Sequence, residues 1–189
     1  MDQSTVLTLF KQSGALHEGH FRLTSGLHSR GYFQSALVLQ YPQHAETLGR
    51  ALGQELRSLG ATAVLSPALG GLIIGHEVAR ALGVRAIFAE RQDSALTLRR
   101  GFSLSAADRV IVIEDVVTTG GSTRETIAVA EAAGAAVVGA GAIVDRSGGA
   151  SRLNVPFRSL VALTIDTFQP DACPLCQAGQ PVTKPGSRA

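Results

Sequence analysis

The chain has 189 residues, a formal net charge of +2, 45% apolar residues and 17% charged residues. This length is enough for one domain with a sizeable core, and the composition excludes a disordered chain. The 21 glycines follow no three-residue period, which excludes a collagen-like chain. The small net charge gives no reason to expect a nucleic acid or a membrane surface as a partner.

The N-terminus and the cysteine count predict a cytoplasmic protein. The opening residues Met1–Ser4 contain neither the basic segment nor the apolar segment of a secretory signal. The most apolar stretch, residues 132–144, is shorter than the roughly 20 residues that cross a bilayer. Two cysteines cannot build a disulfide framework, so we expect reduced thiols and no membrane span.

The hydrophobic pattern predicts the elements in chain order. Residues 1–12 predict a helix, and residues 20–40 predict short strands and a turn. From residue 43 onward, helices are expected at 43–59, 70–82 and 122–133, and strands at 63–65, 85–89, 110–113, 136–144 and 160–165. Residues 90–104 predict a polar loop or hairpin. This alternation is typical of an α/β fold with a mostly parallel sheet flanked by helices.

Polar or glycine residues follow four of the predicted strands. They are Ser66–Gly71, Glu90-Arg91, Glu114-Asp115 and Asp145-Arg146. In open parallel sheets, ligands bind beyond the carboxyl ends of the strands. The sequence therefore predicts a binding site at this edge of the sheet.

The segment 110–123 (VIVIEDVVTTGGST) is the most informative about chemistry. Its glycines let backbone N–H groups approach an anion, and the following helix start adds partial positive charge, so the loop suits a phosphate monoester. No lysine follows the glycines, which excludes a Walker A loop. Glu114 and Asp115 would repel a phosphate but can hold neutral hydroxyls, so a ribose 5-phosphate fits both parts. The alternative is a plain turn with a helix N-cap after an exposed strand end.

Three segments resemble known families. Residues 110–123 resemble the phosphoribosyl-pyrophosphate motif of type I phosphoribosyltransferases. Residues 21–29 (FRLTSGLHS), followed by Tyr32-Phe33-Gln34, resemble the N-terminal hood of orotate phosphoribosyltransferases. The tail from Cys173-Pro174-Leu175-Cys176 onward is similar to that of a thermophile-type bacterial branch. The resemblance implies a single phosphoribosyltransferase domain over 1–189, with a hood-forming segment at 1–40, an α/β core at 41–169 and a CxxC tail at 170–189.

This resemblance implies an enzyme, a glycosyltransferase that moves the 5-phosphoribosyl group from 5-phospho-α-D-ribose 1-diphosphate (PRPP) to orotate. The products would be orotidine 5′-phosphate and diphosphate, in de novo pyrimidine biosynthesis. It also implies Mg²⁺ bound mainly through the substrate diphosphate, and a homodimer whose loop residues reach the partner subunit's site. Two alternatives stay open: a purine phosphoribosyltransferase, and a non-catalytic nucleotide-sensing regulator on the same fold.

The resemblance also implies roles for individual residues. Glu114 and Asp115 would hold the ribose hydroxyls, and Arg146 would bind orotate. The 5′-phosphate would be surrounded by Val116, Val117, Thr118, Thr119, Gly120, Gly121 and Ser122, with Thr118 also facing orotate. The base pocket would be lined by Tyr32 and Phe33, the diphosphate received by Leu69 and Gly70, and Thr24 would stand where the common bacterial form has a lysine. Arg91 and Asp115 are the catalytic candidates, and no protein ligand to a metal is expected.

Two features depart from the common pattern or stay unassigned. The expected mobile loop, residues 90–104, has arginines but neither lysine nor histidine, so Arg99 and Arg100 either substitute electrostatically or are solvated hairpin residues. The CxxC motif of Cys173 and Cys176 favours inert thiols. A structural zinc needs four ligands, and the five histidines lie far from the motif in sequence. A metal site and a redox pair remain as the alternatives.

Overall fold

The computed structural model describes residues 1–23, 25–163 and 166–184. These residues form a six-stranded sheet in the order β5-β4-β3-β6-β7-β8 and a three-stranded sheet in the order β1-β2-β9. The large sheet contains β3 (Ala63–Pro67), β4 (Arg85–Gln92), β5 (Ala95–Leu98), β6 (Arg109–Val117), β7 (Ala136–Asp145) and β8 (Phe157–Ala162). Its flanking helices are α3 (Pro42–Leu56), the short η1 (Arg57–Leu59), α4 (Gly71–Leu82) and α5 (Gly121–Ala132).

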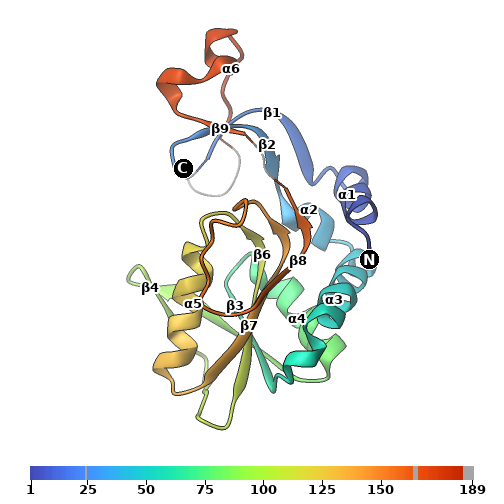
Figure 1. Cartoon of the computed structure of the whole chain (residues 1–189), viewed down its shortest axis with the longest axis vertical. Coiled ribbons are helices and arrows are strands. Elements are labelled where there is room, and N and C mark those ends of the chain that lie inside the picture. The colour runs from blue at the N-terminus through green and yellow to red at the C-terminus, as the bar shows by residue number, and fades with distance from the viewer. Residues whose placement is uncertain (24, 164–165, 185–189) are drawn as a thin grey trace.

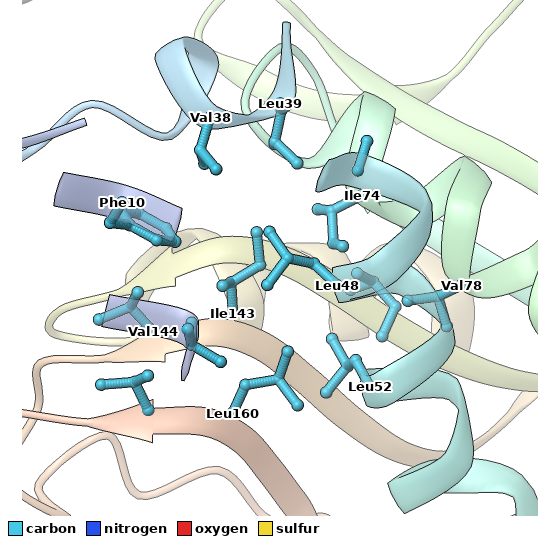
Figure 2. Packing of buried hydrophobic residues seen from close by; sticks show 14 of the residues in the cluster. Phe10, Val38, Leu39, Leu48, Leu52, Ile74, Val78, Ile143, Val144 and Leu160 are labelled. Carbon is cyan, nitrogen blue, oxygen red and sulfur yellow. The ribbon is translucent and has the colours of Figure 1, made fainter. Parts of the chain in front are cut away.

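The large sheet confirms the predicted α/β architecture. All of its neighbouring strands pair in parallel except β4 and β5, which form an antiparallel hairpin at one edge. Helices α3 and α4 cover one face and α5 covers the other (Figure 1). In the first of these layers, Leu48 and Leu52 of α3 pack with Ile74 of α4 and Ile143 of β7 (Figure 2). Burial of each such side chain contributes about 1.5–3 kcal/mol to the stability of the fold. This packing holds the strands, and therefore their ends, in fixed positions.

Close backbone approach explains two glycines of β7. A Cβ atom at Gly141 would lie 2.8 Å from Leu56 Cδ1, and one at Gly139 would lie 2.5 Å from Leu59 Cδ1. Real Cβ atoms do not come this close to their neighbours, so a side chain here would displace the ends of the Leu56 and Leu59 side chains that pack on β7. These glycines therefore let the helix layer sit directly on β7.

The three-stranded sheet, called the hood below, takes strands from both ends of the chain. It contains β1 (Leu16–Arg22), β2 (His28–Phe33) and β9 (Thr167–Phe168), all antiparallel. Thr183 forms a further bridge to Phe21 of β1. Figure 1 shows the red C-terminal segment, with η2 (Pro170–Ala172) and α6 (Pro174–Gln177), beside the blue strands β1 and β2.

Besides a longer β6, the elements differ from the prediction in two further places. Within residues 20–40, predicted as strands and a turn, the structure has a further helix, α2 (Ser35–Leu39), whose Val38 and Leu39 are buried in the core of the large sheet. The strand expected at 160–165 lies at 157–162, and Thr164 and Ile165 lie outside the described residues. The N-terminal helix α1 (Gln3–Gln12) forms as predicted and buries Val6 and Phe10 in the same core. Among the described residues, no helix has the length and apolarity needed to cross a bilayer.

Candidate active site

The two acidic residues of the motif lie inside β6 rather than after it. The strand runs four residues beyond the predicted end because Glu114, Val116 and Val117 stay paired with β7. Successive side chains of a strand point to opposite faces, so Glu114 and Asp115 diverge. Glu114 is buried and Asp115 is half-buried. The pair therefore lies in the last part of β6, a strand of a sheet that helices cover on both faces.

Burial and mutual repulsion govern the charge of this acid pair. Burial raises the pKa of Glu114 well above its ordinary value, and the negative charge of Asp115 raises it further. Backbone N–H groups offset part of this cost: that of Asp115 donates to Glu114 Oε1 at 3.2 Å, and that of Val116 donates to Asp115 Oδ1 at 2.8 Å. Glu114 therefore holds a proton more readily than an ordinary carboxyl does, and its oxygens can contact a neutral hydroxyl at less cost than they can contact an anion.

The loop after β6 is built as an anion cradle. Gly120 has φ of +74°, a left-handed conformation, and α5 begins at the next residue. Arg124 fastens the loop, since its guanidinium donates to the Thr119 carbonyl oxygen at 2.9 Å and also to that of Ser151. A Cβ atom at Gly120 would lie 2.9 Å from the Arg124 guanidinium, so glycine is required. The other residues of the turn are exposed, namely Thr118, Thr119, Gly121 and Ser122.

The loop after β3 lies directly against the acid pair. A Cβ atom at Gly70 would lie 2.9 Å from Asp115 Oδ1, so any side chain there would displace this carboxylate. The neighbouring Leu69 is 80% exposed and follows a cis peptide bond after Ala68. The structure therefore brings together two segments that are separated by more than forty residues in sequence and that we expected at one site.

Arg146 joins the large sheet to the hood. Its backbone N–H donates to the Val117 carbonyl oxygen at 2.7 Å, and its guanidinium donates to Ser29 Oγ at 3.4 Å and lies 5.8 Å from the centre of the Phe33 ring. Within the described part of the chain, its buried Nε has no hydrogen-bond partner. Burial lowers the pKa of Arg146. A half-buried guanidinium with an unused Nε donor is well suited to bind an anionic ligand.

Tyr32 lies within electrostatic reach of the same groups. Burial raises the pKa of its phenol, the negative charge of Asp115 raises it further, and the positive charge of Arg146 opposes this shift. Tyr32 of β2 therefore lies near Asp115 and Arg146, and the ring of the neighbouring Phe33 lies beside the Arg146 guanidinium. Thr24, the remaining hood residue that we singled out, lies outside the described residues.

The hairpin that carries Arg91 is held by ion pairs. Arg91 lies near the end of β4 and its guanidinium pairs with Glu125 of α5. Glu125 is one helical turn beyond Ser122, so Arg91 is fastened to the face of α5 that leads to the anion cradle. Arg99 and Arg100 both pair with Glu90 and keep 49% and 63% of their side-chain surface exposed. In this conformation the acid pair therefore contacts none of these three arginines.

Sequence reasoning missed three residues of this region. Ser29 meets Arg146, Arg124 fastens the cradle, and Glu125 holds Arg91. Arg124 and Glu125 directly follow the motif, so their place at the start of a helix after the cradle was a usable signal. Ser29 ends the hood-like segment 21–29, but nothing in the sequence pointed to its contact with Arg146, which lies 117 residues away.

Comparison with known proteins agrees with this geometry. Residues 37–169 match the model of the phosphoribosyl transferase domain. The orotate phosphoribosyltransferase of Pelotomaculum thermopropionicum is 49% identical over 188 residues, covering 100% of this chain and 99% of that protein. That of Carboxydothermus hydrogenoformans is 51% identical, covering 95% of each chain. The crystal structure of the Aeropyrum pernix orotate phosphoribosyltransferase, 26% identical, superposes with a TM-score of 0.70 over 84% of this chain and 93% of that one. The chain therefore belongs to the phosphoribosyltransferase family and, within it, to the orotate phosphoribosyltransferases.

Proposed function

We propose that this protein transfers the 5-phosphoribosyl group from PRPP to orotate, giving orotidine 5′-phosphate and diphosphate in de novo pyrimidine biosynthesis. One observation carries the proposal: the acid pair of β6 is followed directly by the anion cradle, and half-buried Arg146 lies just after the neighbouring strand β7. The names of the full-length relatives favour this reaction over transfer to a purine. The same names favour an enzyme over a nucleotide-sensing regulator.

The sugar phosphate would bind along the motif. Glu114 and Asp115 suit the two ribose hydroxyls, because a carboxylate accepts from a hydroxyl and a buried protonated carboxyl can donate to one. The 5′-phosphate would be wrapped by the segment from Val116 to Ser122, where exposed backbone N–H groups and hydroxyls meet the positive end of α5. This arrangement keeps the phosphate and the carboxylates at opposite ends of one ligand.

Orotate would occupy the space between the hood and the end of β7. Its carboxylate suits the Arg146 guanidinium, which has an unused Nε donor and a planar shape that matches a carboxylate. The ring of orotate would lie against Tyr32 and Phe33, which supply an aromatic wall, with Thr118 at its side. A base without a carboxylate would leave the buried Nε of Arg146 without a hydrogen-bond partner, which disfavours its binding.

The diphosphate would meet the loop after β3. The backbone N–H groups of Leu69 and Gly70 are the candidate donors, and Arg91 on the β4–β5 hairpin is the candidate cation. The Asp115 carboxylate beside Gly70 offers oxygen atoms of the kind that Mg²⁺ carried by the substrate diphosphate prefers. When bound, Mg²⁺ supplies neutralisation of the charge that develops on the leaving group.

Catalysis would then need electrostatics and exclusion of water rather than a covalent nucleophile. The C1′–oxygen bond to diphosphate breaks, positive charge builds on the ribose, and the C1′–nitrogen bond to orotate forms. The Asp115 carboxylate would lie close to the sugar before the reaction starts, so it would stabilise the positive charge as that charge develops. The turn of the β4–β5 hairpin, beside which Arg91 and Arg100 form exposed ion pairs, is the candidate cover that keeps water from the sugar cation.

We also propose a homodimer with loop residues shared between subunits and a cytoplasmic location. A symmetric dimer is the commonest oligomer, and exposed Leu69 and Ile73 offer apolar surface beside the site. The two thiols are free, in accord with a reducing compartment. Light scattering of the purified protein and cell fractionation test these two points.

A turnover assay tests the reaction. The protein is mixed with PRPP and Mg²⁺, and orotate, uracil, hypoxanthine, adenine and xanthine are each supplied in turn, with Mg²⁺ withheld in a control. We expect Mg²⁺-dependent consumption of orotate alone. Consumption of a purine would replace the proposed substrate, and ligand binding without turnover of any base would point to the regulator.

A further inference from the structure

Four side chains that the proposed reaction does not use meet at the top of the hood. His20 of β1, His28 of β2, and Cys173 and Cys176 at the start of α6 each place one ligand atom within 4.8 Å of the others. Three of them are buried and Cys176 is exposed. The histidines that lie far from the CxxC motif in sequence include two that are close to it in space, because folding brings His20 to Cys173 across 153 residues of sequence.

The distances fit a tetrahedral metal centre. His20 Nε2 lies 2.8 Å from His28 Nδ1, 3.5 Å from Cys173 Sγ and 3.8 Å from Cys176 Sγ, and Cys176 Sγ lies 3.3 Å from His28 Nδ1. In a tetrahedral zinc site, bond lengths of about 2.0–2.3 Å imply ligand–ligand separations of about 3.3–3.8 Å. Of these four separations, the 2.8 Å between the two nitrogens is the one that would have to lengthen to admit the ion.

The surrounding structure aims the ligand atoms inward. His20 Nδ1 lies 2.9 Å from the carbonyl oxygen of Gln180, which can only accept, so Nδ1 carries the proton and Nε2 presents its lone pair to the cluster. One turn of α6 separates Cys173 from Cys176, which places both sulfur atoms on the same side. The antiparallel pairing of β1 with β2 brings the two histidines side by side, with ring centres 4.7 Å apart.

Burial gives a reason for a metal here. His20 is the one buried residue of β1, so this strand brings a polar imidazole, not an apolar side chain, into the interior of the hood. Two thiolates would cancel the charge of a divalent cation, which makes the loaded site neutral and suited to burial. Small units with few apolar side chains commonly use a metal in place of a hydrophobic core.

We propose that His20, His28, Cys173 and Cys176 bind a structural Zn²⁺ that fastens the C-terminal segment to the hood. Two imidazoles and two thiolates in a tetrahedron are the ligand set that zinc prefers, and four protein ligands leave no open position for a substrate. The ion would fix the hood strand that carries Ser29, Tyr32 and Phe33. The proposal is independent of the reaction, because it rests on side chains outside the candidate active site.

Metal analysis of the whole protein tests the proposal. The wild-type chain, purified under reducing conditions and then stripped with a chelator, is titrated with Zn²⁺, and bound zinc is counted by mass spectrometry. Titration with Co²⁺ reports ligand geometry through its visible absorption. We expect one tightly bound zinc ion per chain, and a cobalt spectrum typical of tetrahedral coordination with thiolate ligands.

Variants locate the site. Cys176→Ser, at an exposed position, and His20→Asn should each weaken Zn²⁺ binding by more than the roughly 10–100-fold that loss of a mere supporting contact costs. His17→Asn, which changes an exposed histidine on the same strand, should leave zinc binding unchanged. Failure of the wild-type chain to bind Zn²⁺, equal binding by all variants, or a Cys173–Cys176 disulfide in the protein from cells would each overturn the proposal.

Discussion

The candidate active site and the hood are held together in different ways. The strand ends that carry Glu114, Asp115 and Arg146 belong to a sheet with apolar layers on both faces. The hood sheet has three short strands, and its buried residues include His20, His28 and Ser29. The first region can position charged groups because its backbone is fixed by packing. The hood depends more on polar contacts for its stability. A bound metal can therefore change the stability of the hood more than that of the large sheet.

Loss of the Asp115 charge at the end of β6 should give the largest effect on catalysis. Asp115→Asn should lower kcat/KM by at least about 10²-fold, because the amide no longer stabilises positive charge on the ribose. Steady-state kinetics with PRPP and orotate measure this, and zinc content should stay at the wild-type level. Glu131→Gln, which removes an exposed charge from α5, is the control. Near-normal turnover of Asp115→Asn would remove that residue from the mechanism.

Substitution of Arg146, which joins the large sheet to the hood, should weaken the binding of orotate but not that of PRPP. Arg146→Lys should raise the KM for orotate about 10- to 100-fold, because a charged bidentate contact worth about 1.5–3 kcal/mol is lost. The KM for PRPP should change little. Arg158→Lys, at an exposed arginine on the neighbouring strand β8, serves as the control. An equal rise in both KM values would argue against a contact between Arg146 and orotate.

Removal of the proposed zinc should loosen the hood and spare the large sheet. We expect faster amide hydrogen exchange in β1, β2 and α6 after chelation, and unchanged protection in β6. The KM for orotate should rise by about tenfold, equivalent to about 1.4 kcal/mol, because Ser29, Tyr32 and Phe33 lose their fixed positions. Added Zn²⁺ should reverse both changes. Uniform loss of protection over the whole chain would show that the two regions unfold as one.

Substitution of the buried Glu114 carboxyl in β6 should give the smallest effect, and this effect is on thermal stability. Because the pKa of Glu114 is raised in the folded state, the folded protein binds a proton more strongly than the unfolded chain, and its stability falls as pH rises above the ordinary pKa of 4.5. Glu114→Gln should therefore raise Tm at pH 8 by about 2–4 °C, the shift given by about 1 kcal/mol in a chain of this length. The gain should vanish below pH 4.5.

Thermal unfolding across pH measures this gain, with Glu55→Gln, at an exposed position on α3, as the control. An identical gain for Glu114→Gln at pH 4 and pH 8 would contradict the assignment of a raised pKa to Glu114.

The same contrast explains what could be predicted from the sequence. The run Val110–Ile113 and the acids after it are contiguous, so β6, the cradle and α5 were recognisable from local pattern. The extension of β6 to Val117 depends on pairing with β7, which no local pattern shows. The helix at Ser35–Leu39 forms where two apolar side chains reach the core, which overrode a strand-like composition. The metal cluster draws ligands from both chain ends, so spacing in sequence carried almost no signal.

The joining of both chain ends in the hood has a consequence for biosynthesis. His20 and His28 leave the ribosome early, but their partners Cys173 and Cys176 lie 153 and 148 residues later along the chain. The large sheet, whose last strand ends at Ala162, can be complete before the second pair of ligands is made. During synthesis, N-terminal parts generally fold first. In this protein the N-terminal strands would mature last, and a chain truncated before Cys173 would keep its catalytic platform but lack a closed hood.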